Sequence, residues 1–424
     1  MPSRRRPTRA GWALGLAFVT AAAVAGVLAT RVGADPSSTP PPTPVPPSGS
    51  PSPFPTVLHT PSPSTAQPSV RAPPAVLADL DTGQVLYQRG AGVRHPVASL
   101  TKVMTALLVL ERVRLSDVIT VRTDATREGG ARLGLHAGET IPVRDLLYAL
   151  LLQSSNDAAI ALADHVAGSA GRFVDLMNRR AAELGMDRTA FASPDGLDDR
   201  GTSTANDLLT LTRAASASPV FDRIAGTKTF DIPNPSGPVR HVQNRNPLLW
   251  LYPGATGVKT GFTAAAGYSV IATATRGGVR LVAVVLEDPV EDTSFDDAAA
   301  LLDHGFFAYH RRTLVQTGES LGLVRVDGHP VEVIAGDTVR WLVPTGAAVA
   351  RSLTPDAGLR LPVTAGAVLG QEILSVAGRP VASVPAVAHR SVQVPAPPPV
   401  RRPTAPSPLD VLAALARGLF GGLV

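Results

Sequence analysis

A long segment of proline, serine and threonine most constrains what this chain can fold into. From Pro36 to Pro74 these three residue types predominate, and Arg71 is the only residue with a charged side chain. Such a composition cannot bury a core and favours extended, polyproline-like structure. It predicts a linker over residues 35–74, which separates the first 34 residues from a folded part that begins near Ala75.

The first 34 residues have the pattern of a targeting segment. An arginine cluster precedes an uncharged, apolar run from Gly11 to Thr30, and Val32-Gly33-Ala34 is a candidate cleavage site. The apolar run is about 20 residues long, which is also enough to span a bilayer, so an uncleaved membrane anchor is the alternative to a signal peptide. In either case we expect the rest of the chain in the extracytoplasmic cell envelope, at the outer face of the cytoplasmic membrane.

The charge of the chain lies in that same segment. The formal net charge is +5, and the segment holds no acidic residue and contributes five arginines: Arg4, Arg5, Arg6, Arg9 and Arg31. The remaining residues therefore carry no net basic charge that could neutralise phosphates, and we expect no nucleic-acid partner. The chain has no cysteine, which excludes disulfides, thiolate metal sites and a cysteine nucleophile.

The patterning after Ala75 predicts two folded parts. Strands are expected at Ala75–Leu80, Gln84–Gln88, Tyr268–Thr275 and Arg280–Leu286, and helices at Val97–Val113, Asp145–Val166, Gly171–Leu184, Ala205–Ala215 and Leu301–Tyr309. Strands that frame a helix-rich middle indicate an α/β (α+β) enzyme domain over residues 75–310. Short β-runs separated by turns then predict a small all-β domain over 311–389.

The end of the chain repeats the arrangement of its beginning on a smaller scale. A second proline-rich linker is expected over 390–408, and 409–424 has leucine, valine and phenylalanine at helical spacing. This terminal helix is short for a membrane span and suits an amphipathic helix that lies at the membrane interface. The alternative is a helix that packs on the protein itself.

One short segment contains a candidate nucleophile and base. In Ser99-Leu100-Thr101-Lys102, the spacing of three places the serine hydroxyl and the lysine amine on the same face of a helix. Serine needs a base to take its proton, and a desolvated lysine has a lowered pKa that suits it for this role. Alone, the pair is equally compatible with a helix-capping serine and a solvated lysine.

Two further segments contain polar groups suited to the same chemistry. Ser154-Ser155-Asn156 follows an apolar run and offers a hydroxyl that can relay a proton and an amide that can bind a carbonyl group. Lys259-Thr260-Gly261 precedes a predicted strand and offers a charge and a hydroxyl for a carboxylate, with a glycine that permits close approach of a substrate. Separately, these segments are ordinary turns and strand ends.

Together, the three segments resemble the active-serine set of penicillin-binding proteins and serine β-lactamases. The flanking residues are most similar to the low-molecular-mass, serine-type D-alanyl-D-alanine carboxypeptidases, through His95–Thr105, Ser154–Ala159, Phe173–Asn178, Asp195–Asp198, Ser203–Asp207, Asn246–Leu249 and Gly254–Thr263. The resemblance covers about Ala75 to Tyr309. It implies a penicillin-binding-protein/serine β-lactamase-like transpeptidase domain, followed by the small β-domain.

The resemblance also implies a role for each matching residue. Ser99 attacks the carbonyl between the last two D-alanines of a peptidoglycan stem peptide, and Lys102 is its base. Ser154 passes the proton to the leaving amine and Asn156 holds the substrate amide. The substrate carboxylate binds Lys259 and Thr260, with Gly261 beside it and Thr263 assisting. The backbone N–H groups of Ser99 and Phe262 form the oxyanion hole. β-Lactams resemble the substrate and inhibit by acylating Ser99, and no cofactor or metal is implied.

The sequence departs from the family pattern at two places. Ser155 stands where many relatives have glycine; its side chain is compatible with the site if it points outward, and Ser155 could compete with Ser154 in the proton relay. Ser193-Pro194-Asp195 stands where asparagine and histidine are common, which predicts altered substrate fit.

The sequence leaves other functions open. No motif identifies the deacylating carboxylate that a β-lactamase needs. A D,D-endopeptidase that cleaves cross-links and a catalytically idle module that binds β-lactams or peptidoglycan remain as alternatives.

Overall fold

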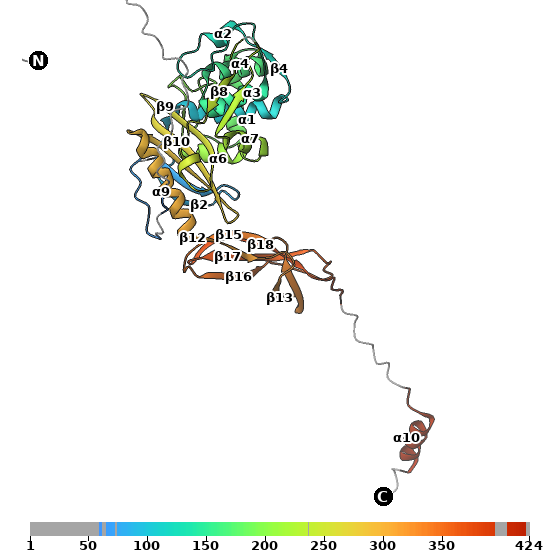
Figure 1. Ribbon diagram of the computed structural model, residues 1–424. Helices are drawn as coiled ribbons and strands as arrows, with labels where there is room; N and C mark the ends of the chain where they lie inside the picture. The colour runs from blue at the N-terminus through green and yellow to red at the C-terminus, as the bar shows by residue number, and fades with distance from the viewer. Residues whose placement is uncertain (1–58, 62–64, 73, 236, 395–404, 421–424) are drawn as a thin grey trace, which may run out of the picture. The chain divides into compact units, whose positions relative to one another are not determined.

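The computed structural model describes residues 59–61, 65–72, 74–235, 237–394 and 405–420 (Figure 1). The predicted signal or anchor segment, 1–34, and most of the predicted linker lie outside the described residues. Every element given below belongs to one unit, Pro53–Val424.

A five-stranded antiparallel sheet forms the centre of the first folded part. Its order is β2-β1-β11-β10-β9, with β1 at Ala75–Asp79, β2 at Val85–Arg89, β9 at Ala255–Thr263, β10 at Gly267–Arg276 and β11 at Val279–Asp288. The predicted hairpins are confirmed: β10 and β11 are joined at Gly277-Gly278, where both glycines have positive φ angles, of 55° and 76°.

The alternating pattern of β11 explains why the sheet has a layer on each face. Val282 and Val284 belong to the core shared with the helical layer, whereas Ala283 and Val285 belong to the core under α9, which spans Glu291–Ala308. Successive side chains of a strand point to opposite faces, so this run of buried residues requires both faces to be covered. Figure 1 shows α9 along the sheet that carries β9 and β10.

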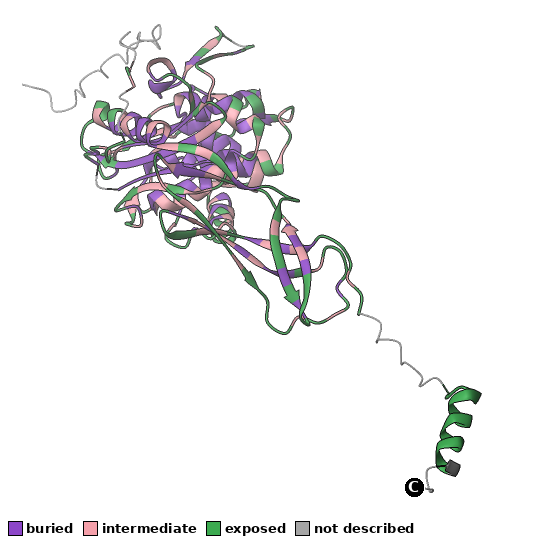
Figure 2. Cartoon of the chain, turned by 90° about the horizontal axis from the view of Figure 1, so that it is seen from below, coloured by how far each residue is buried: buried purple, intermediate pink, exposed green. Residues whose placement is uncertain are grey.

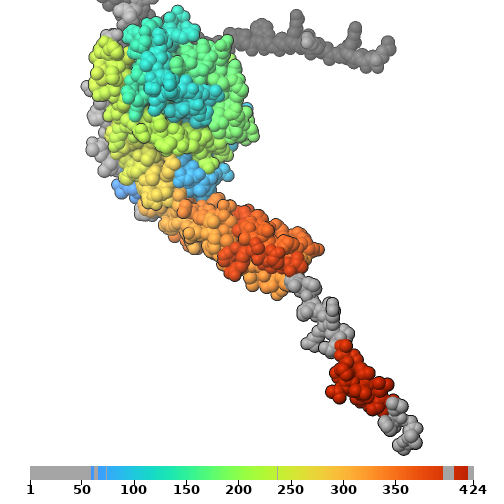
Figure 3. All heavy atoms as spheres, turned by 90° about the vertical axis from the view of Figure 1, so that its right-hand side faces the viewer, coloured from blue at the N-terminus to red at the C-terminus, as the bar shows by residue number. Residues whose placement is uncertain are grey.

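The helical layer lies between β2 and β9 in the sequence. Its main helices are α1 (Lys102–Arg112), α4 (Asn156–Ala167), α5 (Ala170–Glu183) and α6 (Ala205–Ala215), and its shorter ones are α2 (Thr123–Thr126), α3 (Val143–Tyr148), α7 (Pro219–Ala225) and α8 (Leu248–Leu251). Side chains of Ser169, Thr204 and Ser218 cap α5, α6 and α7. In the space-filling view of Figure 3, the cyan to green residues of this layer form one continuous face.

Two-stranded ribbons connect these helices. They are β3 (His95–Pro96) with β6 (Thr202–Ser203), β4 (Val118–Thr120) with β5 (Thr140–Pro142), and β7 (Thr229–Ile232) with β8 (Arg240–Gln243). Strand β3 lies just before Ser99 along the chain. Its pairing with β6 joins the segment before Ser99 to the region just before α6.

The prediction that 145–166 is largely helical is confirmed, with a break at Ser154. The chain forms α3, then a π-turn, η2 (Ala149–Gln153), and then α4. Ser154 separates the last two elements because its backbone is left-handed, with φ 65° and ψ 33°. A non-glycine residue in this conformation, next to a π-turn, is typical of a functional site.

The described end of the predicted proline-rich linker packs on the first folded part. Val70 and Ala72 are buried in the core under α9. The backbone N–H groups of Arg71 and Ala72 donate to one carboxylate oxygen of Asp297, at 2.7 and 2.8 Å. Order therefore extends several residues ahead of β1.

The second folded part is all-β, as predicted. β12 (Tyr309–Val315) pairs with β15 (Val339–Pro344), and a five-stranded sheet has the order β13-β14-β18-β17-β16. The bounds of these strands are Ser320–Val326, His329–Ala335, Arg379–Ala388, Val368–Val376 and Val349–Pro355. The side chain of Gln84 joins the two parts, since its amide donates to Leu342 O at 2.7 Å and accepts from Leu342 N at 2.9 Å.

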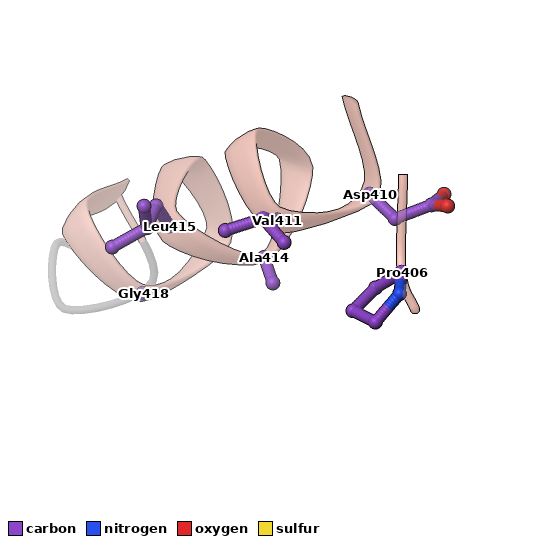
Figure 4. Close-up of a pocket in the computed structure, with 6 residues that line it drawn as sticks. All are labelled: Pro406, Asp410, Val411, Ala414, Leu415 and Gly418. Atoms are coloured by element: carbon purple, nitrogen blue, oxygen red, sulfur yellow. The ribbon is translucent and has the colours of Figure 1, made fainter. Parts of the chain in front are cut away.

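The predicted terminal helix is present as α10, at Pro408–Phe420. Each of its residues with a described side chain is exposed, including Leu409, Leu412 and Leu415 (Figure 2). An open hollow of about 450 Å³ lies along α10 and holds none of the predicted catalytic residues; Figure 4 shows its lining: Pro406, Asp410, Val411, Ala414, Leu415 and Gly418. In the part of the chain that the structure describes, no helix is both long and apolar enough to cross a bilayer.

Candidate active site

The predicted nucleophile lies in a tight turn directly before a helix. Ser99 belongs to a 3₁₀ turn, η1 (Ala98–Thr101), which leads into α1. Ala98 has a positive φ of 46°, and a Cβ added at Gly196 would lie only 1.9 Å from Ala98 O. The backbone at Gly196 therefore packs directly against the residue before Ser99, and only glycine fits there. Ser99 itself is half-buried.

The predicted base, Lys102, is buried, and its Nζ atom has three neighbours at hydrogen-bond distance. The Nζ atom of Lys102 lies 2.9 Å from Ser99 Oγ, 2.7 Å from Asn156 Oδ1 and 2.6 Å from Asp195 O. The side chain has an exposed fraction of 0%, and this burial lowers the pKa of Lys102 to about 7. Near neutral pH, a large share of the Lys102 amines is therefore uncharged.

The two carbonyl oxygens determine what a neutral Lys102 can do. A neutral amine has two N–H donors and one lone pair. Asn156 Oδ1 and Asp195 O can only accept, so they take both donors. The lone pair is then left for the third neighbour, and the Ser99 hydroxyl can donate its proton to Nζ. This arrangement suits general-base activation of a serine nucleophile.

The second segment lies beside this pair, at the start of α4. Asn156 is buried; its Oδ1 accepts from Lys102 and its Nδ2 donates to Gly129 O at 2.7 Å. Ser155 does not meet the condition of pointing outward: its exposed fraction is 0%, and among the described residues its Oγ has no hydrogen-bond partner. The left-handed backbone at Ser154 turns the chain so that Ser155 enters the core.

The third segment brings a second buried lysine to the site. Lys259 lies in β9, and its Nζ donates to Thr260 O at 2.8 Å. Burial lowers the pKa of Lys259 well below its usual value, and the positive charges of Lys102 and Arg245 lower it further. A bound carboxylate would compensate both effects.

Gly261 allows β9 to lie against the serine turn. A Cβ added there would be 3.1 Å from Val97 O and 3.2 Å from both Ser99 N and Leu100 N. The strand and the Ser99 amide are thus in direct contact, as a shared oxyanion hole requires. Next along the strand, Phe262 is 53% exposed, and its ring stacks on Tyr268 with 4.3 Å between centroids.

Thr263 has partners within the protein. Its hydroxyl donates to Asp199 Oδ1 at 2.6 Å and accepts from Ala266 N at 3.1 Å. These bonds join the end of β9 to the loop that carries Asp195 and Gly196. Its predicted role towards substrate stays a prediction.

The structure thus places all three segments in one site, and comparisons with known proteins agree with it. Residues 62–290 match the model of the D-alanyl-D-alanine carboxypeptidase family. The chain belongs to this family. D-alanyl-D-alanine carboxypeptidase DacB2 of Mycobacterium tuberculosis is 40% identical over 252 residues, covering 58% of this chain and 86% of the relative. DacF of Bacillus subtilis, another carboxypeptidase by name, is 29% identical over 341 residues, covering 78% and 88%.

Solved structures of the family share the fold beyond the site. Penicillin binding protein 5 from Haemophilus influenzae superposes with a TM-score of 0.68 and 28% identity, and the match covers 78% of this chain and 99% of that one. The matched length includes a large part of the all-β region, so this chain has the two-part architecture of the carboxypeptidase family.

Sequence reasoning missed Arg245 and Glu128 at this carboxypeptidase site, and it identified Asp195 only as a departure from the family pattern. Arg245 follows β8; its backbone N–H donates to Leu152 O at 3.0 Å, and its charge lowers the pKa of Lys102 and Lys259. Glu128 and Asp195 provide negative charge that raises the pKa of Lys102, against the larger effect of burial. All three lie in loops, where no periodicity marks a residue as functional.

The loop that carries Glu128 is fixed by the motif next to it. Asn156 N donates to Ala131 O at 2.7 Å, and the Asp157 carboxylate accepts from the backbone N–H groups of Leu133, Gly134 and Leu135. Among the described residues, no group of three or more acidic or histidine side chains is placed to hold a metal ion. The site combines a serine hydroxyl next to the buried Lys102 with a second buried lysine, Lys259, in β9.

Proposed function

We propose that Ser99 is the nucleophile of this serine-type D-alanyl-D-alanine carboxypeptidase and that neutral Lys102 is its base. The hydrogen-bond set of Lys102 supports this proposal, because it leaves the amine lone pair facing Ser99 Oγ. Ser99 Oγ attacks the carbonyl carbon between the last two D-alanines of a stem peptide while its proton passes to Lys102. The backbone amides of Ser99 and Phe262 stabilise the negative oxygen that forms.

Collapse of this intermediate needs a proton on the leaving nitrogen. Lys102 is protonated at that stage, and Ser154 passes a proton to the amine so that D-alanine leaves and an ester at Ser99 remains. Water then hydrolyses the ester and releases the shortened peptide. The terminal carboxylate of the substrate binds at Lys259 and Thr260, where Lys259 is buried and the nearby charges that lower its pKa are those of Lys102 and Arg245.

β-Lactams follow the first half of the same path. The β-lactam carbonyl replaces the peptide carbonyl, and its opening leaves a covalent ester on Ser99. The bond between the carbonyl carbon and the ring nitrogen breaks and the nitrogen takes up the proton, but it stays tethered to the adduct through the remaining ring carbons, so no fragment departs to make room for water. We expect slow turnover of this adduct.

The test compares wild type with Ser99→Ala, using a D-Ala-D-Ala pentapeptide and a fluorescent penicillin. Wild type should release D-alanine and become labelled, and Ser99→Ala should do neither. Ser352→Ala, at an exposed serine of β16, is the matched control and should behave as wild type. Labelling of Ser99→Ala would refute the assignment of Ser99 as the nucleophile. Preferential cleavage of a cross-linked dimer would instead identify a D,D-endopeptidase, and an unreactive wild type an idle binding module.

We further propose that the protein acts outside the cytoplasmic membrane and associates with its outer face. The arginine cluster before the apolar run Gly11–Thr30 supports export, and the exposed apolar residues of α10 support contact with lipid. Full-length protein should co-sediment with phosphatidylglycerol vesicles, and removal of residues 409–424 should weaken this binding. Equal binding by a variant that lacks both 1–34 and 409–424 would contradict the proposal.

A further inference from the structure

A β-bulge interrupts the pairing of β10 with β11 close to the active site. Tyr268 pairs with Asp288 and Val270 pairs with Val285, so β11 has one more residue than β10 between these two pairs. Glu287 lies in this bulge, and its backbone is left-handed, with a φ angle of 61°. A bulge bends its strand and can redirect a side chain, and a glutamate in this backbone conformation is uncommon.

The bulge directs the side chain of Glu287 to the segment that leads to Ser99. Glu287 Oε2 lies 2.9 Å from His95 Nδ1, and the His95 side chain is only 16% exposed. A carboxylate can only accept, so the proton of this bond is on Nδ1. His95 belongs to β3, which is two residues long and includes Pro96, a residue without an N–H group. The ion pair therefore adds to a weak backbone pairing and joins β3 to the central sheet.

The chain between His95 and Ser99 has little freedom to absorb a displacement. Val97 is 1% exposed, and Ala98 has a left-handed backbone with a φ angle of 46°. Both ends of this turn pack against β9, since a Cβ added at Gly261 would lie 3.1 Å from Val97 O and 3.2 Å from Ser99 N. A shift of His95 is therefore transmitted to the backbone N–H of Ser99.

The same bulge lies beside the second backbone N–H of the proposed oxyanion hole. Tyr268 pairs with Asp288, which follows Glu287, and on its other side it pairs with Phe262. The rings of Tyr268 and Phe262 also stack, with 4.3 Å between centroids. One row of backbone pairs thus runs from the bulge to Phe262, while the ion pair runs from the bulge to the segment before Ser99.

We propose that Glu287 and His95 are positioning residues, which set the backbone N–H groups of Ser99 and Phe262 relative to each other. The bulge fixes one donor through the sheet and the other through β3. Its contribution is made when negative charge develops on the substrate oxygen, because both donors then act on the same atom. The inference rests on the proposed roles of Ser99 and of its oxyanion hole.

His95→Leu and Glu287→Gly remove the ion pair from its two ends. Glycine adopts a positive φ freely, so Glu287→Gly keeps the backbone of the bulge. Each variant should be acylated by a fluorescent penicillin about tenfold more slowly than wild type, because small displacements at a reacting centre are costly. The double variant should be no slower than either single variant, since both changes remove the same interaction. The Tm of Glu287→Gly should stay within about 4 °C of wild type, because partly exposed ion pairs contribute little to stability.

A transition-state analogue distinguishes positioning from general support of the fold. A peptide boronic acid forms a tetrahedral adduct with a serine, and its inhibition constant should rise about tenfold in both single variants. Binding of a D-Ala-D-Ala pentapeptide to the same variants, each combined with Ser99→Ala, should equal its binding to Ser99→Ala alone. Glu332→Ala is the matched control, because it removes a similar pair in the second folded part, between His389 Nδ1 and Glu332 Oε2 at 3.0 Å. It should leave all of these measurements unchanged.

Three results would overturn the inference. One is acylation at the wild-type rate in either single variant, and if one variant does not fold, the other decides. Another is a roughly hundredfold loss in the double variant, since independent losses multiply. The third is equal weakening of boronic acid and pentapeptide binding. Failure of the proposed function looks different: wild type itself would then not be labelled at Ser99, whereas normal labelling of wild type and both variants refutes the positioning role alone.

Discussion

The two sides of the active site each bury a lysine, but they surround it differently. On the helical side, Lys102 has Ser99 Oγ and two carbonyl oxygens as neighbours, with carboxyl groups close by. On the strand side, Lys259 Nζ donates to Thr260 O, and the charged neighbours that lower its pKa are Lys102 and Arg245. Burial lowers the pKa of both lysines, yet only the first is provided with the acceptors that orient a neutral amine. The second is suited to a carboxylate that arrives with the substrate.

Removal of Lys102, the lysine on the helical side, should have the largest effect on the rate of acylation. General-base catalysis contributes about a hundred- to ten-thousandfold to a rate, so Lys102→Ala should slow acylation of Ser99 by a penicillin about a thousandfold. Stopped-flow fluorescence measures this rate, and circular dichroism checks the fold. Lys259→Ala, the matched loss of a buried lysine from β9, should acylate faster than Lys102→Ala. Slower acylation of Lys259→Ala than of Lys102→Ala would contradict the different roles assigned to the two lysines.

Removal of the strand-side lysine should affect recognition of the carboxylate. A hydrogen bond to a charged group contributes about 1.5–3 kcal/mol, so Lys259→Ala should lower kcat/KM for a D-Ala-D-Ala peptide roughly 10- to 100-fold. Steady-state release of D-alanine measures this. With a peptide whose terminal carboxylate is an amide, wild type and variant should be nearly equal. If kcat/KM of the variant is as far below that of wild type for the amide peptide as for the peptide with a free carboxylate, Lys259 does not bind the carboxylate.

The contact between the two sides should be sensitive to one methyl group. In Gly261→Ala, the new Cβ would lie 3.1–3.2 Å from backbone atoms of Val97, Ser99 and Leu100, so β9 must move away from the serine turn. We expect acylation to slow about tenfold, since small displacements at a reacting centre are costly. Gly171→Ala is the control, because its Cβ would meet open space. Equal acylation rates for both variants would contradict the close packing at Gly261.

The smallest effect on activity is expected from a change at Thr263, which joins the end of β9 to the loop that carries Asp195. Thr263→Val removes the hydrogen bond to Asp199 Oδ1, and such bonds contribute about 1 kcal/mol. Thermal unfolding should show a Tm lower by a few degrees, while kcat/KM falls less than tenfold. A loss as large as that of Lys259→Ala would mean that Thr263 itself binds the substrate carboxylate.

What could be predicted from the sequence depends on how local each signal is. The hairpin of β10 and β11, helix α5 and the segment with Ser99 and Lys102 each depend on neighbours a few residues away. Their patterns are therefore visible in the sequence. The small all-β part follows in the same way from short runs and turns.

The features that the sequence did not predict are those that depend on contacts between residues far apart in the chain. The left-handed backbone of Ser154 and the burial of Ser155 within the largely helical region 145–166 are not revealed by any periodicity. Glu128, Asp195 and Arg245 reach the site from three separate loops, and only the fold brings them to Lys102. Asp195 stood out in the sequence as a departure from the family, but Glu128 and Arg245 did not.

The pH dependence of Ser99 acylation tests the central claim most directly. If neutral Lys102 is the base, the rate for a fluorescent penicillin should rise with pH as a single proton is lost, with a midpoint at about 7, the pKa to which burial lowers this lysine. Below the midpoint the rate should fall about tenfold for each pH unit, because the protonated amine cannot accept the Ser99 proton. Lys102→Ala should show a low rate without this rise. A rise with the same midpoint in Lys102→Ala, or a wild-type rate that does not change between pH 5 and pH 9, would contradict the account.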